Sequence, residues 1–272
     1  MLKKRIIPVI LLKNGFIVQS KKYSIHKNLG NPIAAIRRMS EWGADELIYI
    51  DITKENSFEV SREDLNNENW VSINDVYSGL SKNSFMPTCI MGGIRTFEDI
   101  ENRLKNGADK VGVNTMLFDN PDIVREAVNN FGSQSIVANL DYRLNENGER
   151  FTFINHGTTA TGMNLLESAE WAEKVGCGEI LLQAIDRDGA SRGYDIEGVD
   201  LIVARSSVPV IALGGAGKWG HFETALIETD VSAVAAANIF QFKDQSVFLA
   251  KKYLYNKGIH VRKPELFNLG EL

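Results

Sequence analysis

The sequence predicts a single (β/α)8 barrel of the TIM type. Short apolar runs rich in β-branched residues alternate along all 272 residues with segments of helical period, which is typical of βα units around a parallel sheet. Eight such units in about this length match the usual size of the barrel, ~250 residues. The chain is also 44% hydrophobic, which suffices for one large core.

Eight apolar runs are the expected barrel strands. They cover residues 6–12, 47–52, 87–91, 110–113, 135–140, 180–184, 208–213 and 233–237. Helices are expected to follow them, and several helix starts are recognisable. Asn31-Pro32 and Asn120-Pro121 each combine an N-cap residue with proline at the first helical position, and Thr96 precedes an acidic first turn.

Two segments interrupt this alternation after strand ends. Residues 142–155 predict a hairpin that turns at Asn147-Gly148. Residues 54–70 form a long polar insertion, for which a tolerated surface loop and a role in contacting a substrate or partner are equally acceptable readings. Both segments would lie on the functional face of a barrel, at the carboxyl ends of the strands.

The two halves of the chain resemble each other. Gly92-Gly93, followed by Phe97-Glu98, recurs as Gly214-Gly215 followed by Phe222-Glu223. One strand later, Asn114 recurs as Asn238. We therefore expect one domain over 1–272, made of two half-barrels of roughly 1–131 and 132–272, with matching sites that face each other across the top.

Composition excludes several classes of function. Lys+Arg number 30 against 35 Asp+Glu, so no basic surplus exists for nucleic acid or an anionic membrane. No apolar run approaches the roughly 20 residues that span a bilayer, and the start lacks a secretory signal, so we expect a cytoplasmic protein. Cys89 and Cys177 have no CxxC or His neighbour and are expected to be buried thiols.

The four histidines predict no metal site, because none has metal-ligand spacing. We expect surface or loop roles for His26, His221 and His260. His156 follows the predicted hairpin and is a candidate to face the site.

The repeated glycine pairs are candidate phosphate-binding loops. Glycine lets the backbone approach a ligand closely, and N–H groups at the next helix start attract an anion. The loops after strands 7 and 8 form the common phosphate site of this fold, so the repeat predicts two sites and a ligand with phosphate at both ends. The alternative is that the pairs only make turns at strand ends.

Four strand-end carboxylates, Asp51, Asp141, Asp186 and Asp188, are candidate general acids and bases, with loop salt bridges as the alternative for each. The half-barrel repeat places Leu11 opposite Asp141. One half of a symmetric acid–base pair is therefore missing.

Charged residues also stand at the other ends of four strands. Arg5, Glu46, Lys110 and Glu179 each precede or open an apolar run and should converge as a ring at the bottom of the barrel. By spacing alone, such a cluster is more often a structural ion-pair network than a functional one.

These residues match a known family. The segments MLKKRII, ELIYIDIT, GGIRTFEDI, GADKVGVNT, IDRDG and GGAGK make the chain resemble, nearly end to end, the cyclase subunit of imidazole glycerol phosphate synthase. The resemblance implies a barrel that pairs with a glutaminase, receives ammonia through the bottom and uses it at the top on a bisphosphorylated ribonucleotide, with no metal or organic cofactor.

The resemblance also assigns roles to particular residues. It implies a second catalytic carboxylate at Asp141 and an ammonia gate formed by the four-charge ring. It implies that phosphate binds at Gly93, Asn114 and Thr115 on one side, and at Asp188, Gly189, Gly215 and Asn238 on the other.

Three features depart from the family pattern. Leu11 stands where the family carries its first catalytic Asp, Gln19 stands where it usually has Lys, and the 54–70 insertion exceeds its usual length. The LLKNG motif resembles a branch associated with acetamidino modification of surface sugars, in O-antigen lipopolysaccharide or flagellar glycans.

Three hypotheses follow. The first is a non-cyclising barrel that delivers glutaminase-derived ammonia to a separate ATP-dependent amidotransferase of nucleotide sugars. The second is an authentic cyclase, a lyase of histidine biosynthesis. The third is a scaffold that activates the glutaminase without a substrate of its own.

Overall fold

The computed structural model describes residues 2–14, 16–21, 25–30, 32–53, 73–241 and 243–268. Within them, eight parallel strands close into a barrel, since each strand pairs with the next and the last returns to the first. In spatial order the strands are β1 (Arg5–Lys13), β4 (Leu47–Asp51), β5 (Thr88–Met91), β6 (Lys110–Val113), β7 (Ile136–Leu144), β10 (Glu179–Ala184), β11 (Val210–Leu213) and β12 (Ala233–Ala236). The predicted (β/α)8 barrel is confirmed.

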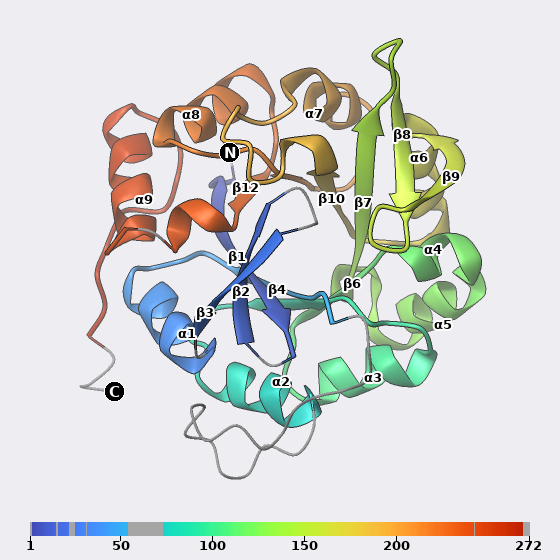
Figure 1. The fold of residues 1–272 in the computed structure, drawn as a ribbon, viewed down its shortest axis with the longest axis horizontal. Helices are drawn as coiled ribbons and strands as arrows, with labels where there is room; N and C mark the ends of the chain where they lie inside the picture. Colours follow the sequence, from blue (N-terminus) through green and yellow to red (C-terminus); the bar gives the residue numbers. More distant parts are fainter. Residues whose placement is uncertain are drawn as a thin grey trace.

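Helices surround the ring of strands (Figure 1). They are α1 (Pro32–Glu41), α2 (Ile73–Lys82), α3 (Phe97–Lys105), α4 (Thr115–Asp119), α5 (Pro121–Phe131), α6 (Leu165–Val175), α7 (Ile196–Val203), α8 (Trp219–Glu228) and α9 (Ser246–Asn256). Short 3-10 turns are η2 (Ser133–Ser135), η3 (Ile185–Arg187) and η4 (Asn238–Phe240). The insertion at 54–70 lies outside the described residues.

The core has two layers because strand side chains alternate between the faces of the sheet. In β1, Ile7, Val9 and Leu11 point into the barrel, whereas Ile6 and Ile10 pack outward under the helices. The inward set places Arg5 and Leu11 at opposite ends of the same interior column. The strand therefore carries a charge to the bottom of the barrel and an apolar side chain to its mouth.

The helix starts follow the sequence signals, with one correction. Thr96 and Asp99 form a reciprocal capping box, so α3 begins as predicted. Pro32 and Pro121 open α1 and α5, whereas the predicted cap Asn31 lies outside the described residues. The Asn120 side chain, however, makes no cap hydrogen bond. This residue also ends α4, where its N–H donates to the Met116 carbonyl, and its φ of −141° and ψ of 64° serve the junction of the two helices.

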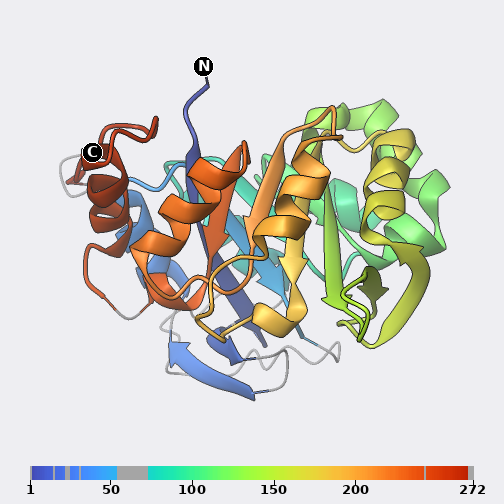
Figure 2. The ribbon, with the colours of Figure 1, turned by 90° about the horizontal axis from the view of Figure 1, so that it is seen from above.

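Two antiparallel hairpins extend the barrel at one end. The predicted hairpin is present: β8 (Arg150–Ile154) pairs with β7, and the turn closes where the Gly148 N–H donates to the Asn145 carbonyl. The sequence did not predict its third strand, β9 (Thr159–Asn164), nor β2 (Phe16–Lys21) and β3 (Ile25–Gly30), which follow β1. Figure 2 shows β2 and β3 at the end of the barrel opposite the N-terminus.

Candidate functional site

A cavity of about 390 Å³ lies at the carboxyl ends of the barrel strands. Six of the eight strands, β1, β4, β5, β6, β7 and β10, contribute residues to its wall. This end of a (β/α)8 barrel carries the active site in essentially every characterised enzyme of the fold, because loops from many strands converge there. The cavity is therefore the candidate active site.

Leu11 and Asp141 both line this cavity. Three strands separate β1 from β7 in either direction around the barrel, so the two residues approach the mouth from opposite sides, as predicted. Asp141 is 5% exposed, and its Oδ1 accepts a hydrogen bond of 3.1 Å from the Asn139 amide. Leu11 is 7% exposed and has no group that transfers a proton. The mouth thus has a carboxylate on one side and an apolar side chain on the other.

Gly93, Asn114 and Thr115, which we call the first glycine subsite, line the same cavity. The turn before them requires glycine: Gly92 has φ +90°, and a Cβ there would lie 2.0 Å from the Asp51 carbonyl oxygen. The Asn114 amide nitrogen donates to the Phe153 carbonyl of β8 at 3.3 Å. Its Oδ1 is buried and has no hydrogen-bond partner among the described residues.

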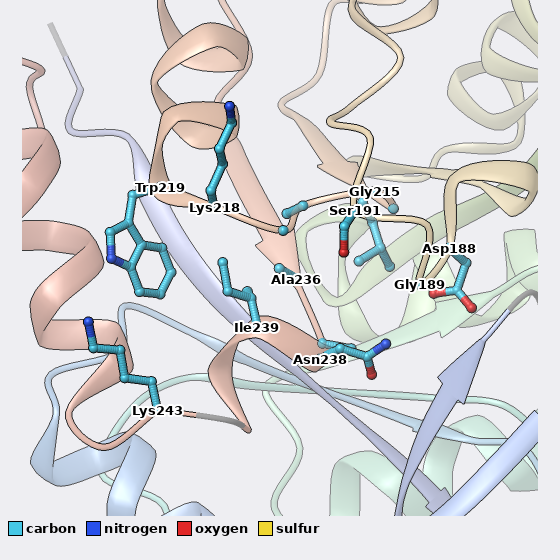
Figure 3. A pocket seen from close by; sticks show the side chains of 15 residues that line it. Asp188, Gly189, Ser191, Gly215, Lys218, Trp219, Ala236, Asn238, Ile239 and Lys243 are labelled. Carbon is cyan, nitrogen blue, oxygen red and sulfur yellow. The ribbon is translucent and has the colours of Figure 1, made fainter.

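The residues predicted for the other side also come together. Asp188, Gly189, Gly215 and Asn238, which we call the second glycine subsite, line a neighbouring cavity of about 340 Å³ (Figure 3). The loops after β10 and β11 touch here, since the Gly193 N–H donates to the Gly215 carbonyl at 2.8 Å. A Cβ on Gly215 would lie 2.2 Å from the Gly193 carbonyl oxygen, so this contact requires glycine.

The two repeated asparagines have a role that the sequence did not reveal. Like Asn114, Asn238 donates its amide to a hairpin backbone, in this case to the Ser20 carbonyl of β2 at 2.8 Å. The Ser20 hydroxyl then donates to Asp188 at 3.3 Å, and Asp188 lines both cavities. Each asparagine therefore fastens one hairpin beside one glycine subsite.

Sequence reasoning also missed residues of the second glycine subsite. Lys218, Trp219 and Lys243 line its cavity, and Figure 3 shows the Trp219 ring between the two lysines. His221, for which a surface or loop role was expected, is partly buried in the first turn of α8, and its Nδ1 accepts a hydrogen bond of 3.1 Å from the Gly217 N–H. Partial burial and the charge of Lys218 lower the pKa of His221, which favours this neutral acceptor form. Lys218, three residues after the second glycine pair, was the available signal.

The remaining candidate residues divide between the cavity and the surface. Asp51 lines the 390 Å³ cavity, and its carboxylate accepts from the Thr53 N–H and the Tyr77 hydroxyl, both at 3.0 Å. His156 also lines this cavity, as its position after the hairpin suggested. Asp186 lines neither cavity and lies 3.7 Å from Arg143 at the surface.

At the opposite end of the barrel, the four predicted charges form a closed ring. Arg5 binds both Glu46 and Glu179. Lys110 lies across from it and binds the same two carboxylates, at 3.0 and 2.8 Å. Positive and negative groups alternate, so each charge has two opposite neighbours. Burial alone would lower the pKa of Arg5 and of Lys110, but the two glutamates outweigh it and raise both.

Other expectations concern thiols, metals and membranes. Cys89 and Cys177 are free and buried, as predicted. In the part of the chain that the structure describes, no group of three or more His, Cys, Asp or Glu side chains is arranged to hold a metal ion. None of the described helices combines the length and apolarity required to cross a bilayer.

A buried ion pair joins the hairpin strand β8 to the start of α7, and it supports a prediction about pH and stability. Arg150 of β8 binds Asp195, at the start of α7, through two hydrogen bonds of 2.6 and 2.8 Å. Burial alone would raise the pKa of Asp195, but the hydrogen bonds and charge of Arg150 outweigh it and leave the pKa lowered. This carboxylate therefore stabilises the fold above its unfolded pKa of about 4, and the contribution is lost as the pH falls through the folded value.

Asp195→Asn is accordingly expected to lower the free energy of unfolding at pH 7 by about 3 kcal/mol, because it leaves Arg150 without its buried partner. Urea unfolding at pH 7 and pH 3 should show a smaller loss on acidification in the variant than in the unmodified protein. Glu197→Gln is the matched control, since Glu197 contacts the same arginine at 3.2 Å from an exposed position and should cost below about 1 kcal/mol. Parallel acid dependence of the unmodified protein and Asp195→Asn would contradict this assignment.

Comparison with known proteins adds to this geometry. The sequence model of the family described as histidine biosynthesis protein matches residues 5–246. The chain is 40% identical over 262 residues to imidazole glycerol phosphate synthase subunit HisF of Hydrogenobaculum sp. (strain Y04AAS1), covering 96% of this chain and 100% of that protein. It is 37% identical over 276 residues to the subunit of the same name from Nitrosopumilus maritimus (strain SCM1), covering 96% and 100%.

Proposed function

The chain belongs to the histidine biosynthesis protein family and is HisF-like within it, and from this premise we propose that it is the ammonia-using subunit of an amidotransferase of the imidazole glycerol phosphate synthase type. The observation that carries the proposal is the pairing of two glycine subsites at the barrel mouth with a four-charge ring at the other end. The mouth would bind the ligand, and the ring would admit ammonia.

The ligand in this proposal carries phosphate at both ends. Gly93 with Asn114 and Thr115 would hold one phosphate, and Gly215 with Gly189 and Asn238 the other. Backbone N–H groups at such loops bind anions without a large local surplus of positive charge. Asp188 borders both cavities, so a single ligand would span the space between them, with its reacting centre near Asp141.

Ammonia would enter through the ring and travel along the barrel interior. Cys89 and Ala233 lie beside the ring, as register partners of Lys110 and Arg5, and apolar side chains such as Val9 line the interior toward the mouth. A glutaminase is the partner proposed for the bottom face, because the ring through which ammonia would enter lies there. Exposed apolar side chains occur just before β1 and β5 and near the ends of α8 and α9: Leu2, Phe85, Ile227 and Tyr255.

Leu11 favours a second candidate for the chemistry at the mouth. Of the expected acid–base pair, this barrel has Asp141 alone. In this candidate it would therefore deliver ammonia to another enzyme instead of closing an imidazole ring. This candidate is the acetamidino modification of a surface nucleotide sugar, together with a separate ATP-dependent sugar amidotransferase. Cyclisation in histidine biosynthesis is the other candidate, and the names of the relatives favour it.

The phosphate subsites can be tested apart from the chemistry. In isothermal titration with a bisphosphorylated ribonucleotide, the unmodified protein should release heat and be thermally stabilised at millimolar ligand. Asn238→Asp places a carboxylate in the second glycine subsite and should weaken binding about tenfold or more by repulsion. Asn130→Asp adds the same charge near the end of α5, away from both cavities, and should leave the affinity unchanged. No heat and no stabilisation of the unmodified protein would refute the proposed ligand class.

A further inference from the structure

A buried cation stands directly behind the first glycine subsite. Arg103 lies on the inner face of α3 and is 4% exposed. Its guanidinium Nη2 donates to the Gly92 carbonyl at 2.9 Å, and a Cβ built on Gly93 would lie 3.4 Å from the same nitrogen. Gly92 and Gly93 line the 390 Å³ cavity, whereas Arg103 does not. The charge thus reaches the cavity wall from inside the protein.

The neighbours of Arg103 do not account fully for its charge. Nη1 donates to the Asp99 carbonyl at 2.9 Å, and Nε is buried with no hydrogen-bond partner among the described residues. The Asp99 carboxylate lies 3.8 Å away, but it already accepts the N–H groups of Arg95 and Thr96 in the capping box of α3. Burying a cation with so weak an ion pair is costly, so a further stabilising partner is expected.

Tyr77 connects Arg103 to the carboxylate of Asp51, which lines the 390 Å³ cavity. The guanidinium lies over the Tyr77 ring, 5.3 Å from its centre, and the Tyr77 hydroxyl donates to Asp51 at 3.0 Å. Tyr77 is fully buried, so its ring is a fixed surface against which the guanidinium packs. Asp51 is in turn fixed by the Thr53 N–H. This network links the end of β4 to the turn that follows β5.

We infer that Arg103 is a positioning residue for the first glycine subsite, with a dianionic phosphate as the partner of its charge across the Gly92-Gly93 turn. The inference rests on the proposed phosphate binding, and it names Arg103 as the group whose charge attracts the anion to the first glycine subsite. The hydrogen bond to the Gly92 carbonyl fixes the orientation of the Gly92–Gly93 peptide. Because C=O and N–H point in opposite directions in a trans peptide, the Gly93 N–H then points away from Arg103. A charge buried behind the turn is also less screened than the exposed lysines of the second glycine subsite.

The test uses amide NMR of labelled protein, which reports each subsite separately in one titration. The probes are sulfate, with two negative charges, and methanesulfonate, with one. Because Coulomb energy is proportional to ligand charge, Arg103→Met should weaken sulfate binding at the Gly93 and Thr115 amides about tenfold and methanesulfonate binding about threefold. Arg103→Lys, which keeps the charge, should lie nearer to the unmodified protein. The affinity reported by the Gly215 amide should change less than twofold in both variants.

Several outcomes would overturn the inference. Equal weakening of both anions would show that Arg103 only shapes the turn, and equal weakening at both subsites would show a general structural effect. If Arg103→Met does not fold, Arg103→Gln provides the neutral variant for the same comparison. Anion binding by the unmodified protein at Gly215 alone would refute this inference and leave the proposed function standing on the second subsite. Binding at neither subsite would refute both.

Discussion

With ammonia and the cyclase substrate supplied, the unmodified protein is expected to form imidazole product at least about a hundredfold more slowly than a barrel with carboxylates at both positions. One positioned acid–base group contributes about 10²–10⁴ in rate, and the side chain that meets Asp141 across the mouth is Leu11, which neither accepts nor donates a proton. The measurement is the ammonia-dependent cyclase assay, which needs no glutaminase.

Leu11→Asp should recover part of this loss, because position 11 already lines the cavity that holds Asp141. Leu11→Asn is the matched control: it has nearly the same shape as Asp and no acid–base function, so it should recover nothing. Gln19 and the 54–70 insertion are two reasons to expect incomplete recovery. Turnover by the unmodified protein near one per second would falsify the non-cyclising candidate and leave cyclisation in histidine biosynthesis as the function.

Lys110→Met is expected to lower the free energy of unfolding by about 3–5 kcal/mol and to leak ammonia. Lys110 binds both Glu46 and Glu179, which are almost fully buried, so its removal leaves two carboxylates sharing Arg5 alone. Urea unfolding measures the first effect. In a complex with the glutaminase, the second should appear as more than one glutamine hydrolysed for each product formed.

Two controls separate these effects from general damage. Adding Glu179→Gln to Lys110→Met removes one charge of each sign and should recover part of the lost stability, because the remaining Arg5 and Glu46 still pair. Lys105→Met breaks an exposed ion pair with Glu101 on α3 and should cost below about 1 kcal/mol. Full coupling in Lys110→Met and in Glu179→Gln alone would count against ammonia passage through the ring.

The same ring shows why part of the site was predictable. Side chains alternate along a strand, so a charge placed two residues before an inward-facing apolar residue must also face inward, as Arg5, Glu46 and Glu179 do. Lys110 faces inward by the same alternation, because the side chains of its neighbours Val111 and Val113 pack outward. The glycine subsites were predictable for a related reason, because the end of every parallel strand lies at the same face of the barrel. Gly93 and Gly215 therefore reach that face whatever the helices do.

The role of Asn114 and Asn238 was not predictable in this way. The repeat identified both residues, but a side-chain amide binds whatever backbone passes within reach, and the hairpin strands β2 and β8 pass there. Arg103 was hidden for a similar reason, since a single Arg on a helix usually lies on its exposed face. Its burial follows from the position of the Tyr77 ring and the Gly92 carbonyl, which come from other elements.

Sequence pattern predicted the (β/α)8 barrel, its eight barrel strands, the ring charges and the repeated glycines and asparagines at the mouth, because these depend on periodicity and on which end of a strand a residue occupies. The folded structure added the strand β9, the hairpin of β2 and β3, the junction at Asn120, the contact of His221 with Gly217 and the burial of Arg103. The burial of Arg103 depends on Tyr77 and Gly92 from other elements, and the junction at Asn120 depends on competition between α4 and α5, so local pattern does not specify either. The hairpin strands and the contact of His221 with Gly217 join residues close in the chain, but side-chain pattern does not show which backbone groups pair there.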